Sequence, residues 1–460
     1  MKGTAMKTDI LIVGSGCSGL YAALNLPRER KITVISKSDL ETNDSYLAQG
    51  GMCVLKDESD YSGYFEDTMR AGHFENDPES VDIMIHSSQG VLHDLLDAGV
   101  VFARKKDGSL DYTREGCHRE KRIVYHEDIT GKEITSHLLE RVKMLDNVTL
   151  VENATLVDII CQGNSCFGGV VRISKETKSS CGGRETAAAG TMAESMRLET
   201  VEADYTILAT GGVGGLYQHS TNYKHLTGDA FAIALMHGIE MKDINYVQIH
   251  PTTLYSEKKE DRSFLISESV RGEGAKLYDK NMERFTDELL PRDKLTEAIH
   301  RQMEKDGTAF VWEDLRPIGE EQLNAHFPNI VKHCAENGYD VTRECIPVVP
   351  AQHYYMGGIR VDHQSKTSMD RLYAVGETAC NGVHGRNRLA SNSLLESLVF
   401  AKRAAEDMTA KYSAAALDRT VLETMDMGEY RDAEALANKY RDIVLTEIRK
   451  ADERESRADV

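Results

Sequence analysis

The chain has 460 residues, 41% of them hydrophobic, with 55 Lys and Arg against 74 Asp and Glu. This length and composition predict a globular protein of two or three domains, and the net charge of -19 disfavours nucleic acid or an anionic membrane as the main partner. No apolar run approaches the roughly 18 residues that span a bilayer, and no signal-peptide pattern precedes the first strand, so we expect a cytoplasmic protein without a membrane partner.

Nine cysteines are scattered singly along the chain. None forms the CxxC pair that is typical of zinc and iron–sulfur sites. An odd number of cysteines without a secretion signal favours reduced thiols. The sequence therefore predicts no metal site.

Residues 9–36 predict the opening of a dinucleotide-binding βαβ unit. An apolar strand at 9–13 and a second strand at 32–36 flank a helical pattern that begins with three glycines in GxGxxG spacing. The first glycine allows a tight turn, the second lets the backbone approach a pyrophosphate, and the third lets helix and strand pack closely. The phosphates would lie at the helix N-terminus. The motif consists of Gly14, Ser15, Gly16, Cys17, Ser18 and Gly19.

An acid is expected about 20 residues after this motif, to bind a ribose hydroxyl. The second strand ends in Ser36 and Lys37 instead, which weakens the case for plain NAD binding. Further strands at 204–212 and 371–379 belong to the same predicted sheet, and the latter carries Glu377. That carboxylate could hold a ribitol or ribose hydroxyl, or it could be a solvated loop acid.

The remaining segments predict an α/β fold in which the nucleotide domain is built from distant parts. Residues 1–238 and 353–411 form the two parts of this Rossmann-like domain, and 239–352 form an inserted α+β capping domain for the substrate. Residues 172–203 within the first part contain many turn formers and predict an exposed hairpin or mobile excursion. Residues 412–460 predict a short C-terminal helical segment.

Several sequence segments together carry a family resemblance. Besides the glycine motif, the segments are AQGG at 48–51, QIHPT at 248–252, PVVPAQHYYMGGI at 347–359, YAVGE at 373–377 and RLASNSLLE at 388–396. With these segments in this order, over roughly residues 6–410, the chain resembles the succinate dehydrogenase and fumarate reductase flavoprotein superfamily.

Within this superfamily, the segment TREGCHREKRIVYHEDITGKE at 113–133 most closely resembles the L-aspartate oxidase group. The resemblance implies FAD and the oxidation of L-aspartate to iminoaspartate by hydride transfer to flavin N5. It also implies that electrons pass to oxygen, giving hydrogen peroxide, or to fumarate, giving succinate. This would be the first step of de novo NAD biosynthesis towards quinolinate, with functional coupling to quinolinate synthase.

The membrane-bound respiratory relatives carry a flavin-linked histidine five residues before the glutamine position of AQGG, where this chain has Asp44. The resemblance therefore implies a non-covalent FAD. It places Leu156 and Val157 beside the adenine. The full implied set is the glycine motif (Gly14, Ser15, Gly16, Cys17, Ser18, Gly19) with Ser36, Lys37, Asp44, Ser45, Tyr46, Leu47, Ala48, Gln49, Gly50, Gly51, Leu156, Val157, Asp229, Glu377, Ser393 and Leu394.

Hydride transfer from the Cα of an amino dicarboxylate requires both carboxylates to be fixed against the flavin. Arg388 suits this task because its planar fork can bind a carboxylate through two parallel hydrogen bonds. His250 and His353 are further candidates, with Thr252 or Thr253 as hydroxyl donors, and the resemblance places matching positions on the dicarboxylate. The alternatives are structural histidines and a surface arginine.

Four other residues are candidates for the proton and amine chemistry. Arg292 matches the family arginine that shuttles a proton between succinate and fumarate, a role that rests on the resemblance because arginine is a poor base at its free pKa. Ser267 and Glu268 match positions near the site, or they form a helix N-cap with a first-turn acid. Glu115 would orient the substrate ammonium group or remove its proton, or it is a surface loop acid.

Three competing functions are considered. A soluble fumarate reductase would use the same dicarboxylate clamp. A flavin-binding redox sensor or regulatory subunit without catalysis is disfavoured because Arg292, Arg388 and both histidines are present. An electron-transfer subunit of a respiratory complex is disfavoured by Asp44 and by the C-terminal segment, which is shorter than the helical domain usual in the L-aspartate oxidase group.

Overall fold

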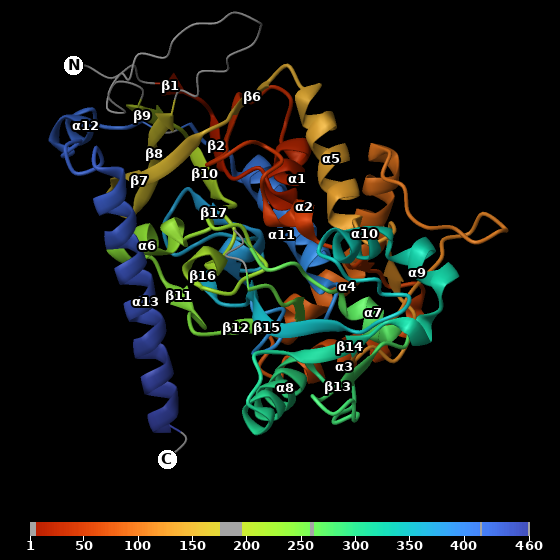
Figure 1. Ribbon diagram of the computed structural model, residues 1–460. Helices are drawn as coiled ribbons and strands as arrows, with labels where there is room; N and C mark the ends of the chain where they lie inside the picture. The colour runs from red at the N-terminus through yellow and green to blue at the C-terminus, as the bar shows by residue number, and fades with distance from the viewer. Residues whose placement is uncertain (1–5, 175–195, 258–261, 415, 459–460) are drawn as a thin grey trace, which may run out of the picture.

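A five-stranded parallel sheet forms the centre of the protein in this computed structural model, which describes residues 6–174, 196–257, 262–414 and 416–458 (Figure 1). Its strands come from four distant stretches of the chain, as predicted for the nucleotide-binding fold. Each strand is a short apolar run. It pairs with a neighbouring strand on one edge or on both. The order is β17 (Leu372–Ala374), β10 (Tyr205–Leu208), β2 (Ile10–Val13), β3 (Ile32–Ile35) and β6 (Val148–Val151).

Alternate residues of β2 point to opposite faces of this sheet, and each face has its own apolar core. Ile10 and Ile12 join the core that the helices of one face cover, whereas Leu11 and Val13 join the core of the other face. Helix α1 contacts both α5 and α11 on the first face, and α4 packs against α11. These helices are α1 (Cys17–Asn25), α4 (Pro78–Ala98), α5 (Thr130–Lys143) and α11 (Asn392–Lys411), with α3 (Tyr61–Ala71) packed on α4.

A second sheet covers the opposite face, in the order β1 (Met6–Lys7), β9 (Met196–Glu202), β8 (Ser165–Ser174) and β7 (Ala154–Gln162). Strands β8 and β9 pair antiparallel, from Gly168 opposite Glu202 to Ser174 opposite Met196. The arms of the hairpin predicted within 172–203 are therefore present. Residues 175–195 of that prediction lie outside the described residues.

The C-terminal segment is helical, as predicted, but its main helix is longer than the apolar pattern indicates. Helix α13 (Ala433–Ala458) follows α12 (Thr420–Thr424) and packs along α6 (Asp229–Met236), as Figure 1 shows in deep blue. One buried side chain in every fourth position from Leu436 to Ile448 faces the core, and charged residues occupy many of the other positions, so the average composition hides the contact. The buried residues are Leu436, Tyr440, Val444 and Ile448.

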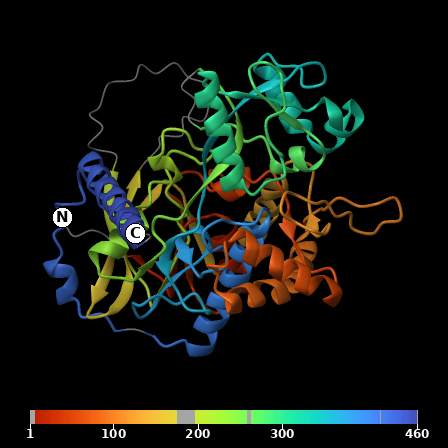
Figure 2. The same cartoon turned by 90° about the horizontal axis from the view of Figure 1, so that it is seen from below.

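Antiparallel strands and helices without βα alternation make up most of residues 247–355, the mixed content predicted for the inserted region. They form a separate group in Figure 2, coloured green to cyan, with its own apolar core. Its sheet runs β12 (Val247–Leu254), β15 (Ile346–Tyr355), β14 (Val311–Asp314) and β13 (Lys276–Tyr278). The helices are α7 (Glu268–Gly272), α8 (Arg292–Asp306), α9 (Glu320–His326) and α10 (Pro328–Glu336).

Two small sheets and one short helix join these parts. Strand β4 pairs with β5 beside the loop that follows α2, and β16 lies between β11 and β18. These elements are α2 (Asp44–Leu47), β4 (Met52–Cys53), β5 (Ile123–Val124), β11 (Met241–Lys242), β16 (Gly358–Arg360) and β18 (Ala379–Cys380).

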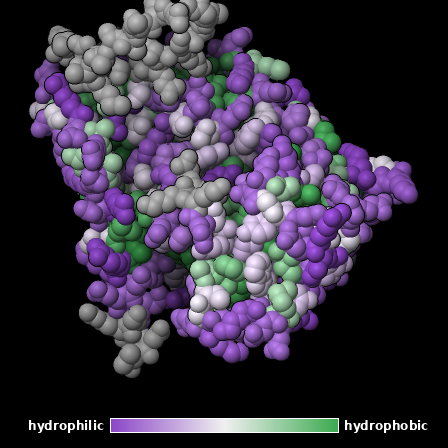
Figure 3. All heavy atoms as spheres, viewed as in Figure 1, coloured by the Kyte–Doolittle hydropathy of each residue, from purple (hydrophilic) through white to green (hydrophobic). Residues whose placement is uncertain are grey.

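The face drawn in Figure 3 is mostly hydrophilic, with apolar residues in patches between the charged ones, which agrees with the high charged fraction. Among the described residues, no helix is both long and apolar enough to cross a membrane.

The turn between β2 and α1 depends on two glycines at close approaches of the backbone. Gly14 has φ +122°, and a Cβ added there would lie 1.9 Å from the Ala209 carbonyl oxygen. A Cβ on Gly19 would lie 2.1 Å from the Gly14 carbonyl oxygen. The glycine motif thus sets α1 directly against the end of the parallel sheet.

We expect Gly14→Ala to lower the free energy of unfolding by about 2–4 kcal/mol, because the new Cβ meets backbone and the φ value is strained for any side chain. Urea unfolding followed by circular dichroism measures this loss. Gly90→Ala in α4 is the matched control: apart from its chain neighbours and its own helix backbone, no described atom lies within 4 Å of the added Cβ, so it should be neutral or stabilising by about 0.5–1 kcal/mol. Equal effects of the two substitutions would contradict this account of Gly14.

Candidate active site

One large cavity opens at the carboxyl ends of the parallel strands and extends to the strands β12 and β15. Carboxyl ends of parallel strands are the usual position of ligand sites in open α/β sheets. The cavity brings together most of the residues that the sequence singled out. Those that line it are Gly14, Ser15, Gly16, Cys17, Ser18, Ser36, Lys37, Asp44, Ser45, Leu47, Ala48, Gln49, Gly50, Gly51, Glu115, Leu156, Asp229, His250, Ser267, Glu268, Arg292, His353, Glu377, Arg388, Ser393 and Leu394.

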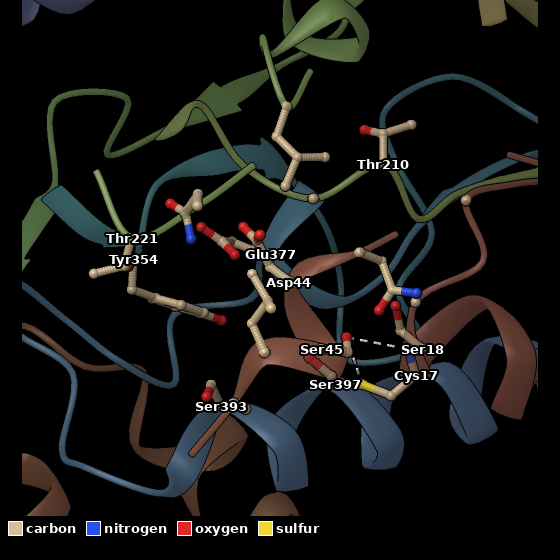
Figure 4. A pocket seen from close by; sticks show the side chains of 18 of the residues that line it. Cys17, Ser18, Asp44, Ser45, Thr210, Thr221, Tyr354, Glu377, Ser393 and Ser397 are labelled. Carbon is tan, nitrogen blue, oxygen red and sulfur yellow. Dashed lines mark hydrogen bonds between the residues drawn. The ribbon is translucent and has the colours of Figure 1, made fainter. Parts of the chain in front are cut away.

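The N-terminus of α1 faces the cavity with free backbone donors. Gly16 is the N-cap of this helix and has no side chain with which to cap it. The Cys17 amide donates to Ser45 Oγ at 3.1 Å (Figure 4). A glycine at the N-cap and a positive helix end suit an anionic group such as a pyrophosphate.

Lys37 marks one end of the cavity. Its Nζ donates to Asp229 Oδ2 at 2.6 Å and to Thr227 Oγ1 at 2.8 Å. Strand β3 does not end in the acid that a nucleotide fingerprint expects, but Asp229, the first residue of α6, brings a carboxylate beside Lys37. Leu156 from β7 lines the same cavity and provides an apolar wall.

Two half-buried carboxyl groups, those of Asp44 and Glu377, lie close together in the middle of the cavity (Figure 4). The Tyr223 amide donates to Asp44 Oδ1 at 3.1 Å, and the Tyr355 amide donates to Glu377 Oε1 at 2.9 Å. Burial raises the pKa of Asp44 to about 7. Burial and the neighbouring Asp44 raise the pKa of Glu377 to about 8. At least one of the two is therefore protonated near neutral pH.

His250, His353 and Arg388 form a group of nitrogen donors at the other end. The two imidazole rings meet edge to face at 5.1 Å, and Arg388 lies over the ring of Tyr354 at 4.3 Å. Burial, together with nearby arginines, lowers the pKa of both histidines well below its usual value, so both rings are neutral. His250 Nε2 and Arg388 Nε are buried without a hydrogen-bond partner in the described part of the chain, which leaves them for a ligand.

Arg292 is the first residue of α8 and holds two neighbours. Its Nε donates to Glu268 Oε2 at 2.6 Å, and its Nη1 donates to Gln248 Oε1 at 2.7 Å. Burial opposes ionisation of Glu268, but Arg292 and Arg271 outweigh it and lower the pKa of this carboxyl. Ser267 is the N-cap of α7 and accepts from the Ser269 amide, so the helix-cap alternative describes Ser267 and Glu268 while both also line the cavity.

Glu115 is a buried cavity residue, with 4% of its surface exposed, and not a surface loop acid. Ser269 Oγ donates to its Oε1 at 2.6 Å, and Ser391 Oγ donates to its Oε2 at 2.5 Å. Burial and the charge of Glu268 raise its pKa. A Cβ on Gly50 would lie 2.8 Å from Glu115 Oε1, so the TREGCH and AQGG segments meet here.

Five predicted site residues lie away from this cavity. Gly19 packs under the β2–α1 turn, and Tyr46 turns towards Lys132, whose Nζ is 5.6 Å from the ring centroid. Val157 is buried in the core between the two sheets. The remaining two hydroxyl groups bind backbone: Thr252 Oγ1 donates to the Ile266 carbonyl at 3.1 Å and Thr253 Oγ1 to the Val349 carbonyl at 2.7 Å.

Several cavity residues were missed by the sequence interpretation. Ser391 lies inside RLASNSLLE, a segment already singled out, and its positive φ of +61° gave no sequence signal. Thr221 Oγ1 contacts His353 Nδ1 at 2.7 Å from a segment without any motif. Other missed lining residues are Thr42, Asn43, Thr210, Asn222, His225, Thr227, Arg262, Leu265, Tyr354 and Ser397.

Comparison with known proteins accounts for this arrangement. A family model described as FAD binding domain matches residues 9–394. L-Aspartate oxidase of Clostridium perfringens is 44% identical over 440 residues, which cover 96% of this chain and 94% of that protein. The chain belongs to the L-aspartate oxidase family. A second member, from Clostridium acetobutylicum, is 44% identical over 88% of each chain.

The fold of this L-aspartate oxidase family member is shared with a fumarate reductase. A variant of the E. coli quinol fumarate reductase superposes with a TM-score of 0.81 at 28% identity, over 95% of this chain and 75% of that one. The predictions of the superfamily, of the L-aspartate oxidase group and of FAD as cofactor are confirmed.

The cavity fits FAD on its own evidence. The close-packed glycine turn and the glycine N-cap of α1 suit the pyrophosphate, and Lys37, Asp229 and Leu156 line the end where an adenosine would lie. The described residues hold no group of three or more His, Cys, Asp or Glu placed to bind a metal ion.

The Asp44 and Glu377 pair should make the apoprotein less stable as pH rises. Both pKa values are raised in the folded state, so the folded protein binds more protons than the unfolded chain between the ordinary values near 4 and the raised values of about 7 and 8. Stability falls across this window. We expect Asp44→Asn and Glu377→Gln each to reduce the loss between pH 5 and pH 8 by at least about 1 kcal/mol.

Urea unfolding of apoprotein at several pH values measures this dependence. Asp57→Asn is a control, because Asp57 is an exposed carboxylate away from the cavity. An unchanged pH slope in both site variants would show that these carboxyl groups ionise normally.

Proposed function

We propose that this protein oxidises L-aspartate to iminoaspartate with FAD, as the first step of de novo NAD biosynthesis towards quinolinate. The observation that carries the proposal is the position of Glu115. A buried carboxylate shares the cavity with Arg292, Arg388 and two neutral histidines, and it suits the ammonium group that distinguishes L-aspartate from succinate. The curated relatives named L-aspartate oxidase support the same conclusion.

The chain would hold FAD without a covalent bond. The start of α1 would bind the pyrophosphate, Lys37 and Asp229 would bind the adenosine, and the AQGG segment and Glu377 would bind the ring system. Bound FAD supplies the two-electron acceptor at flavin N5. Asp44, at the position of the flavin-linked histidine of the respiratory relatives, has a carboxyl group in place of the imidazole.

The substrate carboxylates are fixed by the donors at the histidine end of the cavity. Arg388 has a buried Nε without a partner among the described residues, and His250 has a similar Nε2. A carboxylate between them would satisfy both nitrogens, whereas an empty site leaves their desolvation uncompensated. His353 adds a further imidazole beside His250. These contacts fix the substrate so that its Cα hydrogen points in one direction, as hydride transfer requires.

Glu115 binds the substrate amine and accepts its proton. The Cα carbon loses a hydride and the ammonium nitrogen loses a proton, so a base beside the nitrogen completes the oxidation to the imine. Burial raises the pKa of Glu115, which makes it a stronger base than an exposed glutamate. Arg292, held by Glu268, helps to position a carboxylate and transfers a proton when fumarate is the electron acceptor.

Each part of the chain has a proposed task in this chemistry. Residues 1–238 and 353–411 form the FAD-binding domain, 239–352 form the capping domain that carries His250, Ser267, Glu268 and Arg292, and 412–460 form the C-terminal helical segment. Oxygen or fumarate would accept the electrons, and the product would pass to a quinolinate synthase in the cytoplasm.

A soluble fumarate reductase is the second candidate. The superposition on quinol fumarate reductase favours this candidate. The Arg292–Glu268 pair is compatible with it, because the pair would serve fumarate reduction as well as aspartate oxidation.

Mixing the holoprotein with L-aspartate under anaerobic conditions should bleach the flavin absorbance, and succinate should leave it oxidised. Glu115→Gln should slow the bleaching by at least about tenfold, because the amine loses its charged partner and its base. If aspartate leaves the flavin oxidised while fumarate reoxidises chemically reduced protein, the second candidate is correct.

Acid precipitation should release all of the flavin into the supernatant, because Asp44 offers no imidazole nitrogen for a covalent bond. Absorbance of the supernatant and fluorescence of the washed pellet measure the two fractions. Flavin that stays with the denatured chain would contradict the non-covalent assignment.

A further inference from the structure

A buried chain of hydrogen bonds runs from the region of α3 to the loop before α11. Arg122 has no exposed side-chain surface and forms the first part of it. Its Nη2 and Nε donate to the two carboxylate oxygens of Asp60 at 2.9 and 3.0 Å, and its Nη1 donates to Asp67 Oδ2 at 2.8 Å. Two carboxylates therefore fix this guanidinium in one orientation.

Arg122 determines which nitrogen of His118 carries the proton. Its Nη1 lies 2.9 Å from His118 Nδ1. A guanidinium can donate but not accept, so Nδ1 is the acceptor and the proton is on Nε2. Burial and the charge of Arg122 lower the pKa of His118 to about 4, which keeps the ring neutral. The Nε2 proton then donates to the Ala390 carbonyl at 3.0 Å.

The Ala390 carbonyl precedes the residue that holds Glu115. Ser391 has φ +61°, a left-handed conformation that residues with a Cβ seldom adopt. Its backbone is fixed on both sides, because its own carbonyl accepts from the Cys53 amide at 3.0 Å. In this conformation Ser391 Oγ donates to Glu115 Oε2 and accepts from the Gly51 amide at 3.1 Å.

We propose that Arg122 and His118 are positioning residues that hold Ser391 in this conformation, and that Ser391 sets the direction of the Glu115 carboxylate towards the substrate amine. The inference rests on the proposed function and deepens it. Ser269 holds Oε1 while Ser391 holds Oε2, so the carboxylate cannot rotate about its last bond. The lone pairs that remain are aimed in one direction, which selects a ligand with an ammonium group over an otherwise similar dicarboxylate.

Binding constants of the holoprotein for L-aspartate and succinate test this proposal. Both are measured anaerobically from the first change in flavin absorbance after mixing, before any reduction. Ser391→Ala and His118→Asn should each weaken L-aspartate binding about tenfold, because a misdirected carboxylate loses a charge-assisted hydrogen bond. Succinate binding should change by less than about twofold. His118→Gln should restore aspartate binding, since its amide nitrogen can reach the Ala390 carbonyl.

Two comparisons separate positioning from a general effect on folding. His86→Asn makes the same substitution at an exposed histidine of α4, whose partner is Asp82 on the same helix, and should change neither constant. In a Glu115→Gln background, Ser391→Ala should have no additional effect on aspartate binding, because the residue that it orients has lost its charge.

Equal losses for aspartate and succinate, or an unchanged aspartate constant in Ser391→Ala, would overturn the proposal. Failure of the proposed function is recognised separately, because the wild-type flavin would then not be reduced by L-aspartate. The selectivity of binding would still decide whether Ser391 directs Glu115.

Discussion

The buried ion pair between Arg292 and Glu268 is the interaction on which the site depends. Arg292 begins α8 and Glu268 begins α7, and Arg292 also binds Gln248 of β12. The amide nitrogen of Gln248 donates in turn to the Arg388 carbonyl at 2.9 Å. This chain of contacts ties the antiparallel sheet to the loop before α11. Loss of Glu268 alone would leave the Arg292 guanidinium buried without its carboxylate partner, which is more costly than losing both charges.

Charge compensation within the cavity explains how an acidic protein can bind a dicarboxylate. The net charge of -19 is spread over the surface and screened by salt, whereas Arg388 acts over a few ångströms in a buried site. His250 and His353 are neutral, so they contribute hydrogen bonds without adding charge. Arg292 is compensated by Glu268, whereas Arg388 and Glu115 have no ion-pair partner in the described part of the chain. In the proposed function, Arg388 would bind a carboxylate of L-aspartate and Glu115 its ammonium group.

The sequence predicted the central sheet, and it singled out most of the residues that line the nucleotide end of the cavity, for physical reasons. Strands such as Ile10–Val13 are buried on both faces, so they read as continuous apolar runs, and Gly14 ends the first strand where no side chain fits. The hydroxyl groups of Thr252 and Thr253, predicted as ligand donors, bind backbone carbonyls outside the cavity lining, and β12 contains register shifts at Gln248/Ile249 and between His250 and Thr253. Such bulges change which side chains face the cavity, and the alternation of the sequence does not reveal them.

Contacts between distant segments could not be read from the sequence for a different reason. Ser391 and Glu115 are 276 positions apart, and their contact depends on a left-handed backbone conformation at a serine. The proposed dicarboxylate donors Arg388, His250 and His353 would serve oxidation of aspartate and reduction of fumarate alike, so they cannot decide between the two reactions. Glu115 differs, because its buried carboxylate would attract an ammonium group, which aspartate has and both succinate and fumarate lack. In the proposed function, the distinction between two enzymes of one fold thus depends on the partner of a single substrate charge and on the hydroxyl groups that direct it.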